Sequence, residues 1–303
     1  MGMSLHHSLM THAQPFHLWI LCMDELVEEQ LKAITLPQVS LISLKEIETP
    51  ELLNVKTQRG RGEYCWTITP FTFTAVFEKQ SDIERVTYID ADLYFFRNPQ
   101  ILLKEFDESG KDIFITEHGY APEYDQTLLY GRFCVQFLTA KNNKAALSII
   151  FWWQQKCLDW CYAKLEDGKF GDQKYLDIWT ELFSQNVWIL QQKENTLAPW
   201  NINHFSKYLG NKLNPVFYHF HSFRIVSSKI MLLFYGYKIH KVNMRFYKKY
   251  YLDLVESLIL IKKLGFLVPY ISLTDIMGCS PLKKCIKYIL QGKIKFKIIP
   301  KII

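Results

Sequence analysis

The sequence lacks any hydrophobic run long enough to cross a bilayer. A spanning helix needs about 18 or more consecutive apolar residues. The longest runs, 147–153 and 258–267, are too short or are interrupted by Lys262, Lys263 and Gly265. The N-terminus also lacks the basic region and cleavage site of a signal peptide. These absences predict a location in the cytosol.

Paired cysteines, internal repeats and low-complexity linkers are also missing. The seven cysteines are odd in number and show no paired spacing, which fits a reducing compartment. Cys157 and Cys161 lie one helical turn apart, and we expect them to pack rather than to bind metal. With 303 residues and 49% hydrophobic content, the chain can form one large α/β domain or a domain with an appendage.

Acidic residues are absent from residues 278–303. The same segment contains seven lysines, at positions 283, 284, 287, 293, 295, 297 and 301, separated by Ile, Leu, Phe and Tyr. This mixture predicts binding to an anionic membrane surface, where each lysine near the headgroups contributes about 1 kcal/mol. A solvated tail is the alternative. Nucleic acid is not an expected partner, because no recognised nucleic-acid module accompanies the tail.

Helical and strand patterns alternate along the chain. This order predicts an α/β fold with a Rossmann-like, mixed and mostly parallel sheet that has helices on both faces. Strands are expected at 16–22, 39–44, 86–90, 112–116, 133–138, 187–190 and 216–221, and helices at 4–13, 24–33, 63–80 and 144–165. We expect a catalytic domain over 1–225 and a helical region with the basic tail over 226–303.

The strand pattern at 86–90 ends in Asp90-Ala91-Asp92. Open α/β sheets bind ligands at the carboxyl ends of their strands. Residues two apart point to the same face of an extended strand, and we expect the chain to turn at Asp90 so that both carboxylates serve one ion. Two carboxylates suit Mg²⁺ or Mn²⁺ that carries substrate phosphates. A simple acidic turn is the alternative.

Two later segments follow this motif in order: G-D-Q-K-Y-L-D at 171–177 and F-Y-H-F-H-S-F-R at 217–224. With the Asp-x-Asp motif, they make residues 4–225 resemble bacterial nucleotide-sugar glycosyltransferases of the type-A fold. The similarity is to the lipopolysaccharide and capsule galactosyltransferase-like group related to glycogenin. That group has a first strand before the helix expected at 4–13, and we expect this strand to be absent here.

The resemblance implies a divalent-metal site. Asp90 and Asp92 would bind Mn²⁺ or Mg²⁺, with His219 or His221 as a further ligand. Imidazole favours Mn²⁺ over Mg²⁺, because it is a softer ligand than carboxylate. Arg224 would contact the diphosphate through charge-assisted hydrogen bonds.

The resemblance also implies a donor site. Asp172 and Gln173 would contact the transferred sugar, with a glutamine beside the anomeric carbon indicating retention of configuration. The remaining donor contacts would come from Arg59, Arg61, Ala91, Gln136 and Trp200, and the segment Glu117–Tyr120 would lie near the acceptor.

The expected function is therefore metal-dependent transfer of a sugar from a nucleotide-diphosphate donor. The acceptor would be a glycan or lipid-linked glycan of the cell surface, and the protein would sit on the inner face of the cell membrane. One alternative is a non-catalytic, membrane-associated scaffold with a degenerate transferase fold. Another is a phosphotransferase of the haloacid-dehalogenase type, which Leu93-Tyr94 after the second aspartate disfavours.

Overall fold

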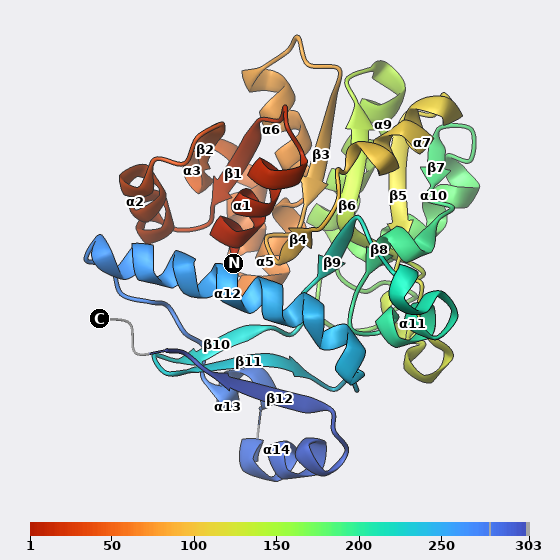
Figure 1. Cartoon of the computed structure of the whole chain (residues 1–303). Helices are drawn as coiled ribbons and strands as arrows, with labels where there is room; N and C mark the ends of the chain where they lie inside the picture. The colour runs from red at the N-terminus through yellow and green to blue at the C-terminus, as the bar shows by residue number, and fades with distance from the viewer. Residues whose placement is uncertain (279, 301–303) are drawn as a thin grey trace. The chain divides into compact units, whose positions relative to one another are not determined.

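The computed structural model describes residues 1–278 and 280–300 (Figure 1). The chain divides into two compact units. The first unit comprises Phe16–Asp90 and Gln100–Lys193, and the second comprises Met1–Pro15, Ala91–Pro99 and the described residues from Glu194 on. The boundary expected at residue 225 therefore falls inside the second unit.

The first unit is built on a mixed four-stranded sheet of order β3-β6-β5-β7. β6 pairs antiparallel with both neighbours, whereas β5 and β7 are parallel. β1 and β2 form a separate parallel pair. The strands are β1 (Leu18–Cys22), β2 (Val39–Ser43), β3 (Arg85–Ile89), β5 (Ile113–Glu117), β6 (Phe133–Lys141) and β7 (Val187–Ile189).

Helices of the first unit pack on this sheet and bury a core that includes Phe73, Trp153 and Trp179. Cys157 and Cys161 are buried in the same core, which confirms their expected packing role. The helices are α2 (Glu25–Ile34), α3 (Leu44–Ile47), α4 (Pro50–Lys56), α5 (Arg61–Ile68), α6 (Phe71–Lys79), α7 (Gln100–Ser109), α8 (Thr127–Tyr130), α9 (Lys144–Asp159) and α10 (Leu176–Leu182).

Three expectations for this unit need correction. The helix expected at 63–80 is two helices, α5 and α6, because Pro70 has no backbone N–H to continue the ladder. The helix expected at 144–165 ends at Asp159, where Trp160 turns extended. Antiparallel pairing of β6 also gives the sheet less parallel character than the alternating pattern predicts.

The second unit contains two three-stranded sheets, of order β4-β9-β8 and β10-β11-β12. Its core is rich in aromatic rings, and the rings of Phe220 and Tyr250 stack at 3.8 Å. The strands are β4 (Leu93–Phe95), β8 (Thr196–Leu197), β9 (Phe217–His219), β10 (Arg224–Ser227), β11 (Ile230–Tyr235) and β12 (Ile294–Ile298). The helices are α1 (Gly2–His12), α11 (Ile202–Leu209), α12 (Met244–Lys263), α13 (Leu273–Met277) and α14 (Pro281–Leu290).

The region expected to be helical, 226–303, contains β11 and β12 beside its helices. β12 pairs antiparallel with β11, and its sequence alternates so that Ile294 is buried while Lys295 and Lys297 are exposed. The alternation is a strand pattern that the lysine content obscures. In the part of the chain that the structure describes, no helix combines the length and apolar character needed to cross a membrane. Lys301 lies outside the described residues.

Candidate metal and donor site

The chain turns sharply between the two aspartates. β3 ends at Ile89, and the backbone N–H of Asp90 donates to the carbonyl of Gln136 on β6 at 3.1 Å. Ala91 and Asp92 form a turn, and β4 begins at Leu93. This geometry confirms that the chain departs from extended structure at Asp90.

Asp92 and His219 form an ion pair inside the second unit. β4 pairs with β9 so that Leu93 lies opposite His219, which places the histidine beside the preceding aspartate. His219 Nε2 lies 3.1 Å from Asp92 Oδ1, and the two side chains are 7% and 16% exposed. Burial alone would raise the pKa of Asp92, but His219, His221 and Arg224 hold it well below its usual range.

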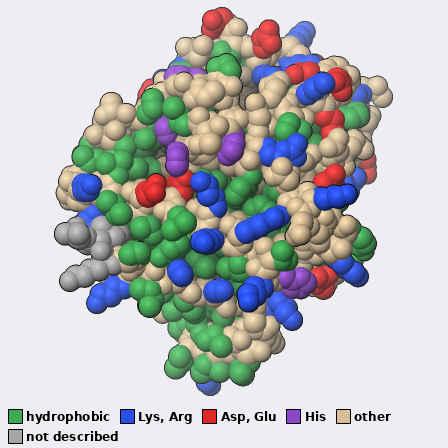
Figure 2. Space-filling view, viewed as in Figure 1, with side chains coloured by type: hydrophobic (Ala, Val, Ile, Leu, Met, Phe, Trp, Pro, Cys, Tyr) green, Lys and Arg blue, Asp and Glu red, His purple; other side chains and the backbone are tan. Residues whose placement is uncertain are grey.

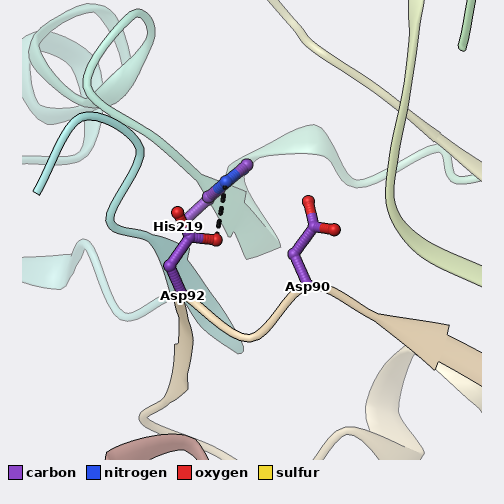
Figure 3. Close-up of side chains that lie close together, drawn as sticks. All are labelled: Asp90, Asp92 and His219. Carbon is purple, nitrogen blue, oxygen red and sulfur yellow. Dashed lines mark ion pairs between the residues drawn. The ribbon is translucent and has the colours of Figure 1, made fainter. Parts of the chain in front are cut away.

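Asp90 completes a cluster of possible metal ligands. Only Ala91 separates it from Asp92, so the covalent chain itself keeps the two carboxylates near each other. One ligand atom from each of Asp90, Asp92 and His219 lies within 4.8 Å of the others (Figure 3). Two carboxylates with one imidazole form a donor set that suits Mn²⁺ and is compatible with Mg²⁺.

Aromatic rings surround the histidine side of this cluster. Trp200 is buried, with its ring centroid 5.5 Å from that of His219 and 5.4 Å from that of His221. His221 is exposed and is not one of the three clustered ligands, so its role in metal binding stays a prediction. Arg224 is half-buried and donates to the carbonyl of Phe223 at 2.7 Å.

Asp172 is a buried carboxyl group in the first unit. Loss of solvation, followed by the charge of Asp90, raises its pKa to about 8. Trp153 Nε1 donates to the Asp172 carbonyl at 2.9 Å, which anchors the backbone at this point. The Asp172 carboxyl group also accepts hydrogen bonds from Thr69 and from the backbone of Gln173, which lower its pKa by less than burial and Asp90 raise it.

The neighbouring glutamines have defined positions in the same unit. Gln173 Nε2 donates to the carbonyl of Tyr130 at 2.9 Å, which fixes its amide against the loop before β6. Gln136 is buried on β6, and its carbonyl accepts the hydrogen bond from Asp90. The contacts of Gln136 and Gln173 with a donor stay predictions. The donor contact expected of Ala91, which is exposed in the turn, also stays a prediction.

The two arginines expected to contact the donor already have partners within the protein. Arg59 is buried and donates to Thr67 Oγ1 and to the carbonyls of Cys157 and Leu158 at 2.5–2.6 Å. It thus binds the last carbonyls of α9 and helps to end that helix, a role that sequence patterns do not reveal. Arg61 is exposed and pairs with Asp24 at 2.9 Å.

Sequence reasoning missed several polar residues of the first unit. Tyr88 of β3 donates to Asp90 Oδ1 at 3.0 Å, and its position two residues before Asp90 could have suggested this contact. Glu117 ends β5 in a cavity of about 200 Å³ and binds Arg132 and Lys193, each at 2.6 Å. Of the residues in this ion-paired cluster, only Glu117 was expected near the acceptor. Arg132 and Lys193 were missed because they lie far from Glu117 in the sequence.

These features define an α/β protein with a candidate two-carboxylate, one-histidine cation site at a strand end. No family model matches the chain. It belongs to the same family as two proteins of Bacillus subtilis strain 168, the uncharacterized proteins YfnD and YfnF. YfnD is 33% identical over 251 residues, with 78% of each chain covered. YfnF is 34% identical over 240 residues, which cover 75% of this chain and 78% of its own.

Several solved glycosyltransferase structures are distantly similar. GlyE of Streptococcus pneumoniae TIGR4 aligns with 87% of this chain and 60% of its own at 16% identity and a TM-score of 0.46. Mouse xyloside xylosyltransferase 1 aligns with 72% of this chain and 90% of its own at 15% identity and 0.45. The galactosyltransferase LgtC aligns with 72% of this chain and 81% of its own at 13% identity and 0.43.

Proposed function

We propose that the protein is a metal-dependent glycosyltransferase that uses a nucleotide-diphosphate sugar. The clustering of Asp90, Asp92 and His219 at the end of a strand is the observation that supports this proposal most directly. A divalent cation bound there would neutralise the charge that develops on a diphosphate leaving group. Two carboxylates and one imidazole are ligands that suit such an ion.

The remaining residues have roles that follow from their chemistry. Arg224, half-buried and one strand from His219, supplies a further positive charge for the diphosphate. Asp172 and Gln173 present a carboxyl and an amide, which are suited to sugar hydroxyls. With an amide in place of a carboxylate base beside the anomeric carbon, the reaction is expected to proceed with retention. Trp200 is buried with its ring edge-on to His219 and His221, so its role is to position these histidines.

The cavity around Glu117 is a reasonable acceptor subsite. Its lining combines Tyr120, Asp125 and Thr127 with the ion-paired cluster Glu117, Arg132 and Lys193. The ring of Tyr120 stacks on that of His118 at 4.6 Å. Such a mixture of aromatic and hydrogen-bonding groups suits a carbohydrate acceptor of the cell surface.

A donor screen tests the proposal. Thermal unfolding is measured with a panel of nucleotide sugars, each with and without Mn²⁺. We expect one donor to raise the unfolding midpoint only when Mn²⁺ is present, because the cation links protein and diphosphate. A non-catalytic scaffold that has lost donor binding would show no metal-dependent shift with any member of the panel.

Gln173→Ala tests the sugar subsite. Loss of the amide removes a sugar contact, so transfer should slow by at least about tenfold while the affinity for the bare nucleoside diphosphate changes less than about twofold. Single-turnover transfer and calorimetric titration measure the two quantities. If diphosphate affinity falls as much as the rate does, Gln173 belongs to the nucleotide part of the site.

We propose that a surface formed by α14 and β12, here called the basic-apolar face, contacts an anionic membrane. Figure 2 shows hydrophobic and basic side chains side by side over this part of the chain. On α14 the apolar side chains of Leu282, Ile286, Ile289 and Leu290 are more than half exposed and recur at helical spacing. Exposed lysines flank them, which is the pattern of an interfacial helix.

Not every apolar residue between the lysines belongs to this exposed face. Phe296, one of the apolar residues between the lysines, is only partly exposed and packs with Leu232 in a small core of the second unit. Cys285 and Ile294 are buried in the same core. Deletion of residues 278–303 would therefore remove packing and a paired strand as well as charge, so point substitutions are the cleaner test.

Leu282→Ser, Ile286→Ser and Leu290→Ser combined are expected to weaken binding to phosphatidylglycerol vesicles at least about tenfold, or about 1.4 kcal/mol. The substituted side chains are exposed, so the unfolding midpoint should stay close to that of the unaltered chain. Leu26→Ser, at an exposed leucine of the first unit, is the matched control. Equal vesicle sedimentation for both variants would show that α14 is only a solvated helix.

A further inference from the structure

A cavity of about 630 Å³ in the second unit has a strongly basic lining. Three cationic side chains line it, those of Lys212, Arg245 and Lys249, together with Asn211 and Asn214. No carboxylate belongs to this lining. The three cations come from two segments, the end of the turn before β9 and the first two turns of α12.

The cavity is separate from the candidate metal site. β4 and β9 run antiparallel, with Leu93 opposite His219 at one end and Phe95 opposite Phe217 at the other. Asp92 precedes the first end, whereas Phe96 follows the second and lines the cavity. Four residues of extended chain separate Asp92 from Phe96, which is roughly 13 Å. A ligand in the cavity is therefore not the diphosphate bound at Asp92.

The positive charges of the cavity are not neutralised within the described residues. None of Lys212, Arg245 and Lys249 forms an ion pair there. Arg245 and Lys249 lie four residues apart on α12, a spacing at which like charges repel and destabilise a helix. Burial and then the charge of Lys249 lower the pKa of His12. A multiply charged anion would relieve this repulsion.

Arg245 is held in position for such an anion. One guanidinium nitrogen donates to the carbonyl of Leu213 at 2.5 Å, and the group lies 4.9 Å from the centroid of the Phe246 ring. The remaining N–H groups keep the fork geometry that matches phosphate oxygens. The first turn of α12, a helix of 20 residues, contains no acidic residue, so its partial positive charge adds to the field.

We propose that this cavity binds a phosphate-bearing ligand at a site distinct from the donor site. Phosphate groups match the three cations in charge, and the asparagine amides supply further hydrogen bonds. The ligand is either a soluble phosphorylated molecule or the phosphate headgroup of a lipid, which present the same chemistry to the cavity. The site does not depend on the proposed sugar transfer.

Binding of inorganic pyrophosphate to the full chain tests the proposal by calorimetry in the presence of EDTA, so that no metal contributes. Arg245→Ala with Lys249→Ala should weaken binding at least about tenfold, because two charge-assisted contacts are lost. Lys248→Ala is the matched control, since Lys248 is exposed on the same helix but outside the lining. Asp92→Asn should also leave pyrophosphate affinity unchanged, which separates this site from the donor site.

Sedimentation with phosphatidylglycerol and phosphatidylcholine vesicles forms the second arm. Weaker pyrophosphate binding with unchanged vesicle binding in the double variant identifies a soluble phosphate ligand. Weaker pyrophosphate binding together with a selective loss of phosphatidylglycerol binding identifies a lipid headgroup. Lys212→Glu, on the other segment, should reproduce whichever loss is seen. Absence of binding in both arms, or binding that these substitutions leave unchanged, would overturn the proposal.

Discussion

Asp92→Asn is expected to slow sugar transfer at least about 100-fold and to abolish the Mn²⁺ dependence of donor binding. The substitution keeps the size of the side chain but removes the charge that is shared between His219 and the cation. A loss of about 2.7 kcal/mol of transition-state stabilisation corresponds to this factor. Initial rates with the donor found by thermal screening, and calorimetric titration of Mn²⁺ in its presence, measure the two effects.

Asp82→Asn is the matched control, because Asp82 is an exposed aspartate in the turn before β3. It should keep full activity. Circular dichroism of the Asp92 variant should match that of the unaltered chain, since the asparagine can still hydrogen-bond the imidazole of His219. Unchanged turnover in a folded Asp92→Asn protein would refute metal binding at this cluster.

The cluster of Asp90, Asp92 and His219 could be predicted from the sequence. Its two aspartates are close neighbours in the chain, and each part of the cluster adjoins a recognisable strand pattern. Asp90 and Asp92 are separated by one residue, so the covalent chain keeps their carboxylates near each other whatever the local conformation. His219 was chosen from the resemblance, and the register that places Leu93 opposite it supplies the physical reason. The strands of the first unit lie within a few residues of their expected positions for the same reason of local periodicity.

Properties that depend on tertiary environment were not accessible in this way. Arg59 was expected to contact the donor, yet its guanidinium donates to carbonyls of residues about a hundred positions away. Asp172 has the sequence context of a helix cap, and only packing shows that it is buried beside another acid. The cationic cavity also went unnoticed, because Lys212 and Arg245 meet only through the fold.

The buried carboxyl of Asp172 gives the second large expected effect, on stability. Its pKa is about 8 in the folded protein against an ordinary value of 3.8. The folded state therefore retains a proton that the unfolded chain releases, and the free energy of unfolding should fall as pH rises from about 4 to about 8. At about 1.4 kcal/mol per pKa unit, the loss is on the order of several kcal/mol.

Asp172→Asn should remove this loss, because the amide cannot ionise and has nearly the shape of the protonated acid. The variant is expected to be more stable than the unaltered chain above pH 8, and the difference should vanish near pH 4. Urea unfolding at several pH values, with EDTA present, measures it, with Asp82→Asn as the exposed control. Mn²⁺ should flatten the pH dependence of the unaltered chain, since a cation at Asp90 favours the ionised form of Asp172. Parallel stability curves for the Asp172→Asn and unaltered proteins would show that Asp172 is ionised in the folded state throughout this range.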